Sequence, residues 1–197
     1  HITDAEKITE NEKINGIDSG NQKDTWVPIE KGFKKSDLYY KPSTEYINWS
    51  KESVSSLQNE SRARWQGYEY FFREGAFISR GGFADLKARY VNHSVIDNTG
   101  TILSPISEDV LPSKYLVGLL NSKIPIQITE NFINSSGMET SDIRMIPVPI
   151  PSEKELKDVE SFVNKAIKIQ NSERQGSIEE VQSDLDELFA TIYHVEI

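Results

Sequence analysis

Residues 143–155, with the sequence IRMIPVPIPSEKE, contain the change of pattern that decides the fold. Proline occupies alternate positions from Pro147 to Pro151, and each proline lacks the backbone N–H that a central strand needs. We therefore predict an extended edge segment that ends at Pro151. The next four residues, Ser152-Glu153-Lys154-Glu155, have the spacing of a helix capping box, so a helix is expected to begin there.

Beyond this point, apolar residues recur at helical spacing. One set lies within residues 156–167 and a second within residues 178–192, and Gln175-Gly176-Ser177 separates them. The pattern predicts a helical hairpin over residues 152–197 with polar outer faces.

A shorter helix is predicted over residues 113–121, SKYLVGLLN, with Ser113 as its N-cap and leucines along one stripe. From these patterns we expect four residues to belong to the core, namely Leu119, Leu120, Ile146 and Val148.

The part of the chain before these helices is typical of strands, because short aromatic and β-branched runs alternate with turn residues. The runs are residues 26–29, 38–40, 46–49, 68–73, 76–79, 88–91, 94–97 and 101–103. We predict an α+β fold with mixed, largely antiparallel strands and a C-terminal helical hairpin. Residues 1–24 are mostly polar and are predicted to form a flexible lead-in, which leaves residues 25–151 as the main domain and residues 152–197 as the hairpin.

The net charge of −9 and a pI near 4.9 argue at first against a nucleic-acid partner. The charges are unevenly distributed, however. Residues 61–100 carry six basic and four acidic side chains, including five of the seven arginines, whereas residues 151–197 carry five basic and eleven acidic ones. A local cationic face on an acidic body is therefore expected.

Composition argues against several other classes of protein and site. The chain has no Cys, which excludes disulfides and thiolate chemistry and favours a cytoplasmic protein, and its three histidines do not easily build a zinc site. Mean hydropathy is −0.52, and no apolar run has the length of a membrane helix, so we expect no membrane association. Because the chain starts at His1 without Met, we expect it to be part of a longer protein.

The arginines of residues 61–100 alternate with aromatic residues. Guanidinium groups suit phosphates and guanine edges, and aromatic rings either pack a sheet or stack on bases. The alternative is that the rings form core and the arginines an ordinary hydrated surface, and composition does not decide between the two.

Two further hypotheses stay open. Glu74, Asp85 and Lys87 have the spacing of a metal-dependent nuclease site with two carboxylates and one lysine, although this pattern is common and Glu74 is predicted to lie in a turn. The chain is alternatively a protein-interaction domain that docks through its acidic helices. No nucleotide-binding glycine loop or activated nucleophile motif is present in the sequence.

Three stretches resemble one known family. They are GAFISR at residues 75–80 with the following Phe83, ARY and SVID runs, YLVGLLNSK at residues 115–123, and the proline run at residues 143–151 followed by the helix pair. In this order they resemble the TaqI-like C-terminal specificity (target recognition) domain of adenine-specific DNA methyltransferases and type IIG restriction enzymes. KGFK at residues 31–34 and YINW at residues 46–49 are similar to the opening element of that family.

The resemblance implies a target recognition domain of a restriction–modification enzyme, which reads double-stranded DNA for a methyltransferase or endonuclease domain. The family's catalytic Asn-Pro-Pro-Tyr motif and cofactor loop are absent from this sequence. Catalysis is therefore expected on another part of the same chain or on a partner subunit. S-adenosylmethionine and Mg²⁺ are implied for that parent enzyme, and no cofactor or metal is expected in this chain.

The predicted DNA contacts combine this resemblance with the positions of the cations. Base or groove contacts are expected from Ser79, Arg80, Lys87 and Arg89, phosphate contacts from Arg62, Arg64 and Arg73, and a second basic patch from Lys31, Lys34 and Lys35. The polar loop Asn134-Ser135-Ser136 is a further candidate for reading bases, with a simple hydrated loop as the alternative.

Overall fold

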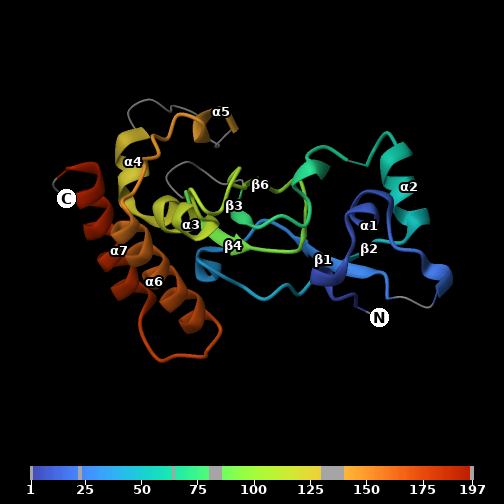
Figure 1. Ribbon diagram of the computed structural model, residues 1–197, viewed down its shortest axis with the longest axis horizontal. Helices are drawn as coiled ribbons and strands as arrows, with labels where there is room; N and C mark the ends of the chain where they lie inside the picture. Colours follow the sequence, from blue (N-terminus) through green and yellow to red (C-terminus); the bar gives the residue numbers. More distant parts are fainter. Residues whose placement is uncertain (1, 22–23, 64, 80–85, 130–139, 196–197) are drawn as a thin grey trace. The chain divides into compact units, whose positions relative to one another are not determined.

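A computed structural model of the chain describes residues 2–21, 24–63, 65–79, 86–129 and 140–195 (Figure 1). The described residues form a mixed α+β structure with two small, mostly antiparallel sheets and a C-terminal pair of helices, as the sequence predicts. The chain divides into two compact units. The first unit comprises residues 1–31, 43–74 and 91–98, and the second comprises residues 32–42, 75–90 and 99–197.

The first unit is built on a three-stranded sheet in the order β2-β1-β5. Strand β1 (Trp26–Glu30) pairs antiparallel with β2 (Tyr46–Asn48) and parallel with β5 (Val95–Ile96). The helical elements of this unit are η1 (Ala5–Lys7), α1 (Glu10–Asn15), η2 (Ser19–Asn21), α2 (Lys51–Asn59) and η4 (Tyr68–Tyr70).

The described residues of the N-terminal segment are folded, in contrast to the flexible lead-in predicted for residues 1–24. Ala5, Ile8 and Ile17 are buried and belong to the same core as Trp49. Helix α1 is stabilised by a complete capping box at its first turn. A few apolar residues among many polar ones suffice to bury a short segment against an existing sheet, which the polar composition of residues 1–24 does not indicate.

The second unit contains a three-stranded sheet in the order β4-β3-β6. Strand β3 (Gly75–Ser79) pairs antiparallel with β6 (Gly100–Leu103), and β4 (Ala88–Val91) lies on its other side. The helical elements are η3 (Lys35–Asp37), α3 (Ser113–Asn121), α4 (Lys123–Thr129), α5 (Thr140–Ile143), α6 (Glu153–Gln170) and α7 (Ile178–Tyr193).

Helix α3 is the centre of the second unit, since it packs against β3 on one side and against α6 and α7 on the other (Figure 1). Leu119 and Leu120 are buried, as predicted. At Gly118 a Cβ atom would lie only 2.8 Å from Cγ1 of Val159, so glycine lets α3 and α6 approach closely. The helix bounds match the prediction, but the N-cap is Pro112, and Ser113 instead bonds to the Glu108 carboxylate.

The C-terminal helices confirm the predicted hairpin. Ser152 and Glu155 form the capping box of α6, and the side chain of Ser177 caps α7. The two helices lie side by side (Figure 1) and bury Val159, Val163, Val181, Leu185 and Phe189 completely.

The proline run differs from its prediction. Residues 147–151 form no strand, and Val148 is 42% exposed rather than buried, whereas Ile146 does lie in the core. Without backbone N–H groups at the prolines, this segment is held through its carbonyls. The hydroxyl of Tyr115 donates to the Pro149 carbonyl at 3.2 Å, and that of Tyr193 donates to the Pro147 carbonyl.

Two predicted strands are also replaced by other structure. Residues 38–40 form a single bridge from Tyr39 to Arg89, because Tyr39 adopts a positive φ of 66° that interrupts the extended backbone. Within residues 68–73 the chain forms the short helix η4 instead of a strand. The other six predicted runs each contain one of the strands β1, β2, β3, β4, β5 and β6.

Candidate nucleic-acid interface

The residues predicted to contact DNA fall on both units. Lys31, Arg62 and Arg73 belong to the first unit, and Lys34, Ser79, Lys87 and Arg89 belong to the second. Arg64, Arg80, Asn134, Ser135 and Ser136 lie outside the described residues, as does the side chain of Lys35.

Arg89 does not lie on an exposed face. It is only 5% exposed, and its guanidinium carbon lies 5.0 Å from the ring centre of Phe33 and 5.4 Å from that of Phe77. A guanidinium group over aromatic rings is attracted by their negative faces, and more strongly so away from water. The structure thus places Arg89 in the packing of the second unit and not on the exposed surface on which its predicted DNA contact depends.

Ser79 also has a structural contact. It is half-buried at the end of β3, and its Oγ accepts a hydrogen bond of 3.2 Å from the backbone N–H of Phe33. This bond fixes the start of segment 32–42 on the sheet. Lys34 is exposed on the same segment, and Lys87 is half-buried just before β4.

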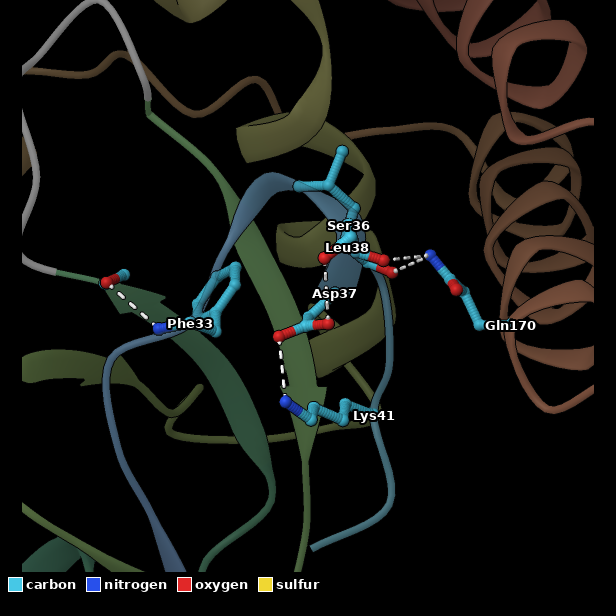
Figure 2. Close-up of polar contacts among 7 residues, drawn as sticks. Phe33, Ser36, Asp37, Leu38, Lys41 and Gln170 are labelled. Atoms are coloured by element: carbon cyan, nitrogen blue, oxygen red, sulfur yellow. Dashed lines mark hydrogen bonds and ion pairs between the residues drawn. The ribbon is translucent and has the colours of Figure 1, made fainter. Parts of the chain in front are cut away.

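Segment 32–42 is tied to the C-terminal helices as well (Figure 2). The side-chain amide of Gln170, at the end of α6, donates to the carbonyls of Ser36 and Leu38 at 3.1 and 3.0 Å. Lys41 pairs with Asp37 at 3.0 Å. Burial by itself raises the pKa of Asp37, but the hydrogen bond and charge of Lys41 outweigh it, and the net effect lowers that pKa below its usual value.

The residues of the LLNSK run (residues 119–123) have an internal role that sequence reasoning missed. The side chain of Asn121 makes two hydrogen bonds to the backbone of Ala88, accepting from its N–H at 2.9 Å and donating to its carbonyl at 2.8 Å. Asn121 therefore joins α3 to strand β4 in the way a neighbouring strand would. An asparagine that follows two buried leucines at a helix end is the only sequence signal of this role.

A buried carboxylate continues this network. Asp186 of α7 is 2% exposed, accepts a hydrogen bond of 2.8 Å from the backbone N–H of Lys123, and pairs with its ammonium group at 3.2 Å. Gln182 donates to Asp186 and to the Asn121 carbonyl, and accepts from the hydroxyl of Tyr39. Burial and, less strongly, the charge of Asp186 raise the pKa of Tyr39.

Lys31 of the first unit is paired rather than open. Its ammonium group donates to the Glu45 carboxylate, and this hydrogen bond is the main reason that the pKa of Lys31 is raised. An anion would therefore compete with Glu45 for this lysine.

Two exposed arginines of the first unit lie in the same stretch of chain as exposed aromatic rings, and one of them contacts a ring. Arg62 and Arg73 are both exposed, and Tyr68 and Tyr70 are 40% and 43% exposed. The guanidinium carbon of Arg73 lies 5.4 Å from the centre of the Tyr70 ring. We call Arg62, Tyr68, Tyr70 and Arg73 the Arg–Tyr surface, and it combines the two residue types that bind phosphates and bases.

The residues of the metal-nuclease hypothesis are only partly described. Glu74 and Lys87 are half-buried, and Asp85 lies outside the described residues. Among the residues that the structure describes, no three acidic or histidine side chains gather in a way that could hold a metal ion.

Comparison with known proteins gives no function for the residues described above. No protein-family model matches the chain, and no curated protein matches it in sequence. Within the described ranges, no helix has both the length and the apolar character needed to cross a bilayer.

Proposed function

We propose that the chain is a DNA sequence-recognition (specificity) domain of a restriction–modification enzyme. It positions double-stranded DNA for an adenine methyltransferase or endonuclease domain that lies elsewhere on the same chain or on a partner subunit. In this proposal the chain has no catalysis of its own, works in the cytoplasm, and leaves S-adenosylmethionine and Mg²⁺ to the parent enzyme.

One observation carries the proposal. The stretches that resemble target recognition domains, at residues 75–80, 115–123 and 143–151, are far apart in sequence and belong to one compact unit. Within it, β3, α3 and the helix pair share a single hydrophobic core. The Asn121–Ala88 hydrogen bonds give the LLNSK run a structural role in this unit, because they connect helix α3 to strand β4.

The distribution of charge is compatible with this role. Arg62 and Arg73 are exposed cations within the net-positive residues 61–100, and guanidinium groups of this kind contact phosphates. The exposed carboxylates of α6 and α7 would be repelled by phosphates, so a bound duplex is expected to avoid these helices.

The proposal is tested by selecting duplexes from a randomised pool with the 197-residue chain at low ionic strength. We expect binding that weakens steeply with salt and an enriched short sequence motif. The selection should be repeated with a methyltransferase partner that carries the missing catalytic motif. Absence of duplex binding in both experiments at low salt would overturn the proposal, and binding without any enriched motif would reduce it to non-specific DNA binding.

A further inference from the structure

Three aromatic rings form a stack that runs from the core of the first unit to its surface. Trp49 is completely buried, and its ring centre lies 5.7 Å from that of Trp65 with an interplanar angle of 17°. The Trp65 ring in turn lies 5.6 Å from that of Tyr68, at 16°. We call Trp49, Trp65 and Tyr68 the ring ladder, whose outer ring belongs to the Arg–Tyr surface.

The inner end of the ring ladder is held rigidly. The indole N–H of Trp49 donates to the carbonyls of Glu12 and Lys13 at 3.1 and 3.2 Å. Phe71 and Phe72 meet the Trp49 ring edge-on, with ring centres 5.8 and 5.4 Å away. These contacts fix the plane of the stack, so a ligand that stacks on it would not have to order it first.

The outer end is presented by a short turn. Gly67 has a φ of 80°, which other residues rarely adopt, and it leads directly into η4 with Tyr68 and Tyr70. Tyr68 is 40% exposed although one side of its ring is covered by Trp65. The outer ring of the ladder is therefore partly open to solvent, with guanidinium groups nearby in sequence on both sides, at Arg62 and Arg73.

We propose that the ring ladder is a stacking platform for an unpaired DNA base, with Arg62 and Arg73 binding the phosphates next to that base. This inference rests on the proposed function, and it adds the binding of an unpaired base to the binding of duplex DNA. Bases inside a duplex present only their edges, so an exposed ring face stacks only on a base that is unpaired, at an overhang, a gap or an extruded position. The two arginines favour an anionic polymer over an apolar peptide as the occupant.

The test uses fluorescence anisotropy with the 197-residue chain and three DNA probes. They are a blunt duplex, the same duplex with a single-stranded thymine overhang, and a single-stranded oligothymidine. We expect the overhang to strengthen binding about 5- to 150-fold, which corresponds to the free energy of one aromatic–base stack. Tyr68→Ala should abolish this gain, and Tyr68→Phe should keep it because the ring remains.

Tyr46→Ala is the matched control, since Tyr46 is a similarly exposed tyrosine of the first unit outside the Arg–Tyr surface. It should leave the overhang gain unchanged. Thermal unfolding of all three variants establishes that each one is folded. Quenching of tryptophan emission by oligothymidine, lost in Tyr68→Ala, gives a second measurement that does not depend on affinity.

The possible outcomes separate this inference from the proposed function. Duplex binding without an overhang gain, or a gain that Tyr68→Ala retains, would overturn the platform and leave duplex recognition intact. Single-strand binding through Tyr68 without duplex binding would support the platform and overturn the proposed function. If none of the probes binds at low salt, both are overturned.

Discussion

Arg73 and Arg89 each lie over aromatic rings, but in opposite surroundings. Arg73 of the first unit is exposed, with its guanidinium carbon 5.4 Å from the centre of the Tyr70 ring. Arg89 of the second unit is 5% exposed and lies over two phenylalanines at 5.0 and 5.4 Å. An arginine over an aromatic ring thus occurs once in contact with water and once away from it.

The difference shows that exposure decides what an arginine is able to do. An exposed guanidinium keeps hydrated donors that a phosphate can take over, whereas a buried one contributes its flat surface and its charge to the packing of its neighbours. Both arginines look alike in sequence, since each lies near aromatic residues in the net-positive segment. The predictions below test this contrast between the two units.

The largest effect is expected at Arg89. Arg89→Ala removes a buried side chain and its contacts with two rings, and should lower the free energy of unfolding by about 2–4 kcal/mol. Urea unfolding followed by near-UV circular dichroism measures this change. Arg89→Lys should recover only part of it, because an ammonium group lacks the flat surface. Arg73→Ala is the control and should change stability by no more than about 0.5 kcal/mol. Equal losses of stability in Arg89→Ala and Arg73→Ala would show that the two arginines do not differ in their structural role.

The second effect concerns how the second unit is held together. Asn121→Ala removes the partner of the Ala88 N–H and leaves the Ala88 carbonyl with only the Tyr39 N–H as donor, which should cost about 1–3 kcal/mol of stability. Hydrogen exchange at the Ala88 amide should become faster in this variant. Asn59→Ala, at an exposed asparagine that bonds only within its own helix in the first unit, is expected to change little. Unchanged exchange at Ala88 would contradict the role given to Asn121.

The third prediction addresses DNA binding by the exposed arginine. Arg73→Gln should weaken duplex binding and reduce the slope of log K against log salt by about one, as expected when one phosphate contact is lost. Arg73→Lys should retain the slope because the charge remains. Titrations over a series of salt concentrations measure both. A slope that is the same in Arg73→Gln and in the unmodified chain would exclude a phosphate contact at this residue.

The smallest effect is expected from the Asp37–Lys41 pair. The pKa of Asp37 is lowered in the folded state, so its contribution to stability is present above the usual aspartate pKa and is lost as the pH falls through the lowered value. Asp37→Asn should remove this part of the acid sensitivity, by no more than about 1 kcal/mol for a surface pair. Unfolding measured from pH 6 down to pH 2 compares the two proteins, and parallel curves would show that the pair contributes nothing.

Helices α3, α6 and α7 and most strands could be predicted because local patterns determine them, whereas helices α1, α2, α4 and α5 were not predicted. The capping box at Ser152, the break at Gln175-Gly176-Ser177 and the leucines after Ser113 each require only neighbouring residues, and the starts of α6 and α7 agree with the structure. The α+β class follows from the same patterns.

The individual site residues could not be predicted in this way. Whether Arg89 points into the core or into water depends on which face of β4 is covered by Phe33 from a distant segment. The buried positions of Ile8 and Ile17 likewise depend on contacts with Trp49 and its sheet. Such long-range contacts leave no periodic signal in the sequence, so the sequence shows that residues 61–100 are cationic but not which of their side chains lie at the surface.

The division of the chain has a consequence for how such a protein evolves. The polypeptide passes from one unit to the other after Lys31, Pro42, Glu74, Tyr90 and Asn98, so neither unit corresponds to one continuous piece of the gene. A single genetic crossover anywhere between these points would separate parts of both units at once. New variants of this chain are therefore expected to arise by point substitution within it, or by exchange of the whole coding region, rather than by shuffling one half of it.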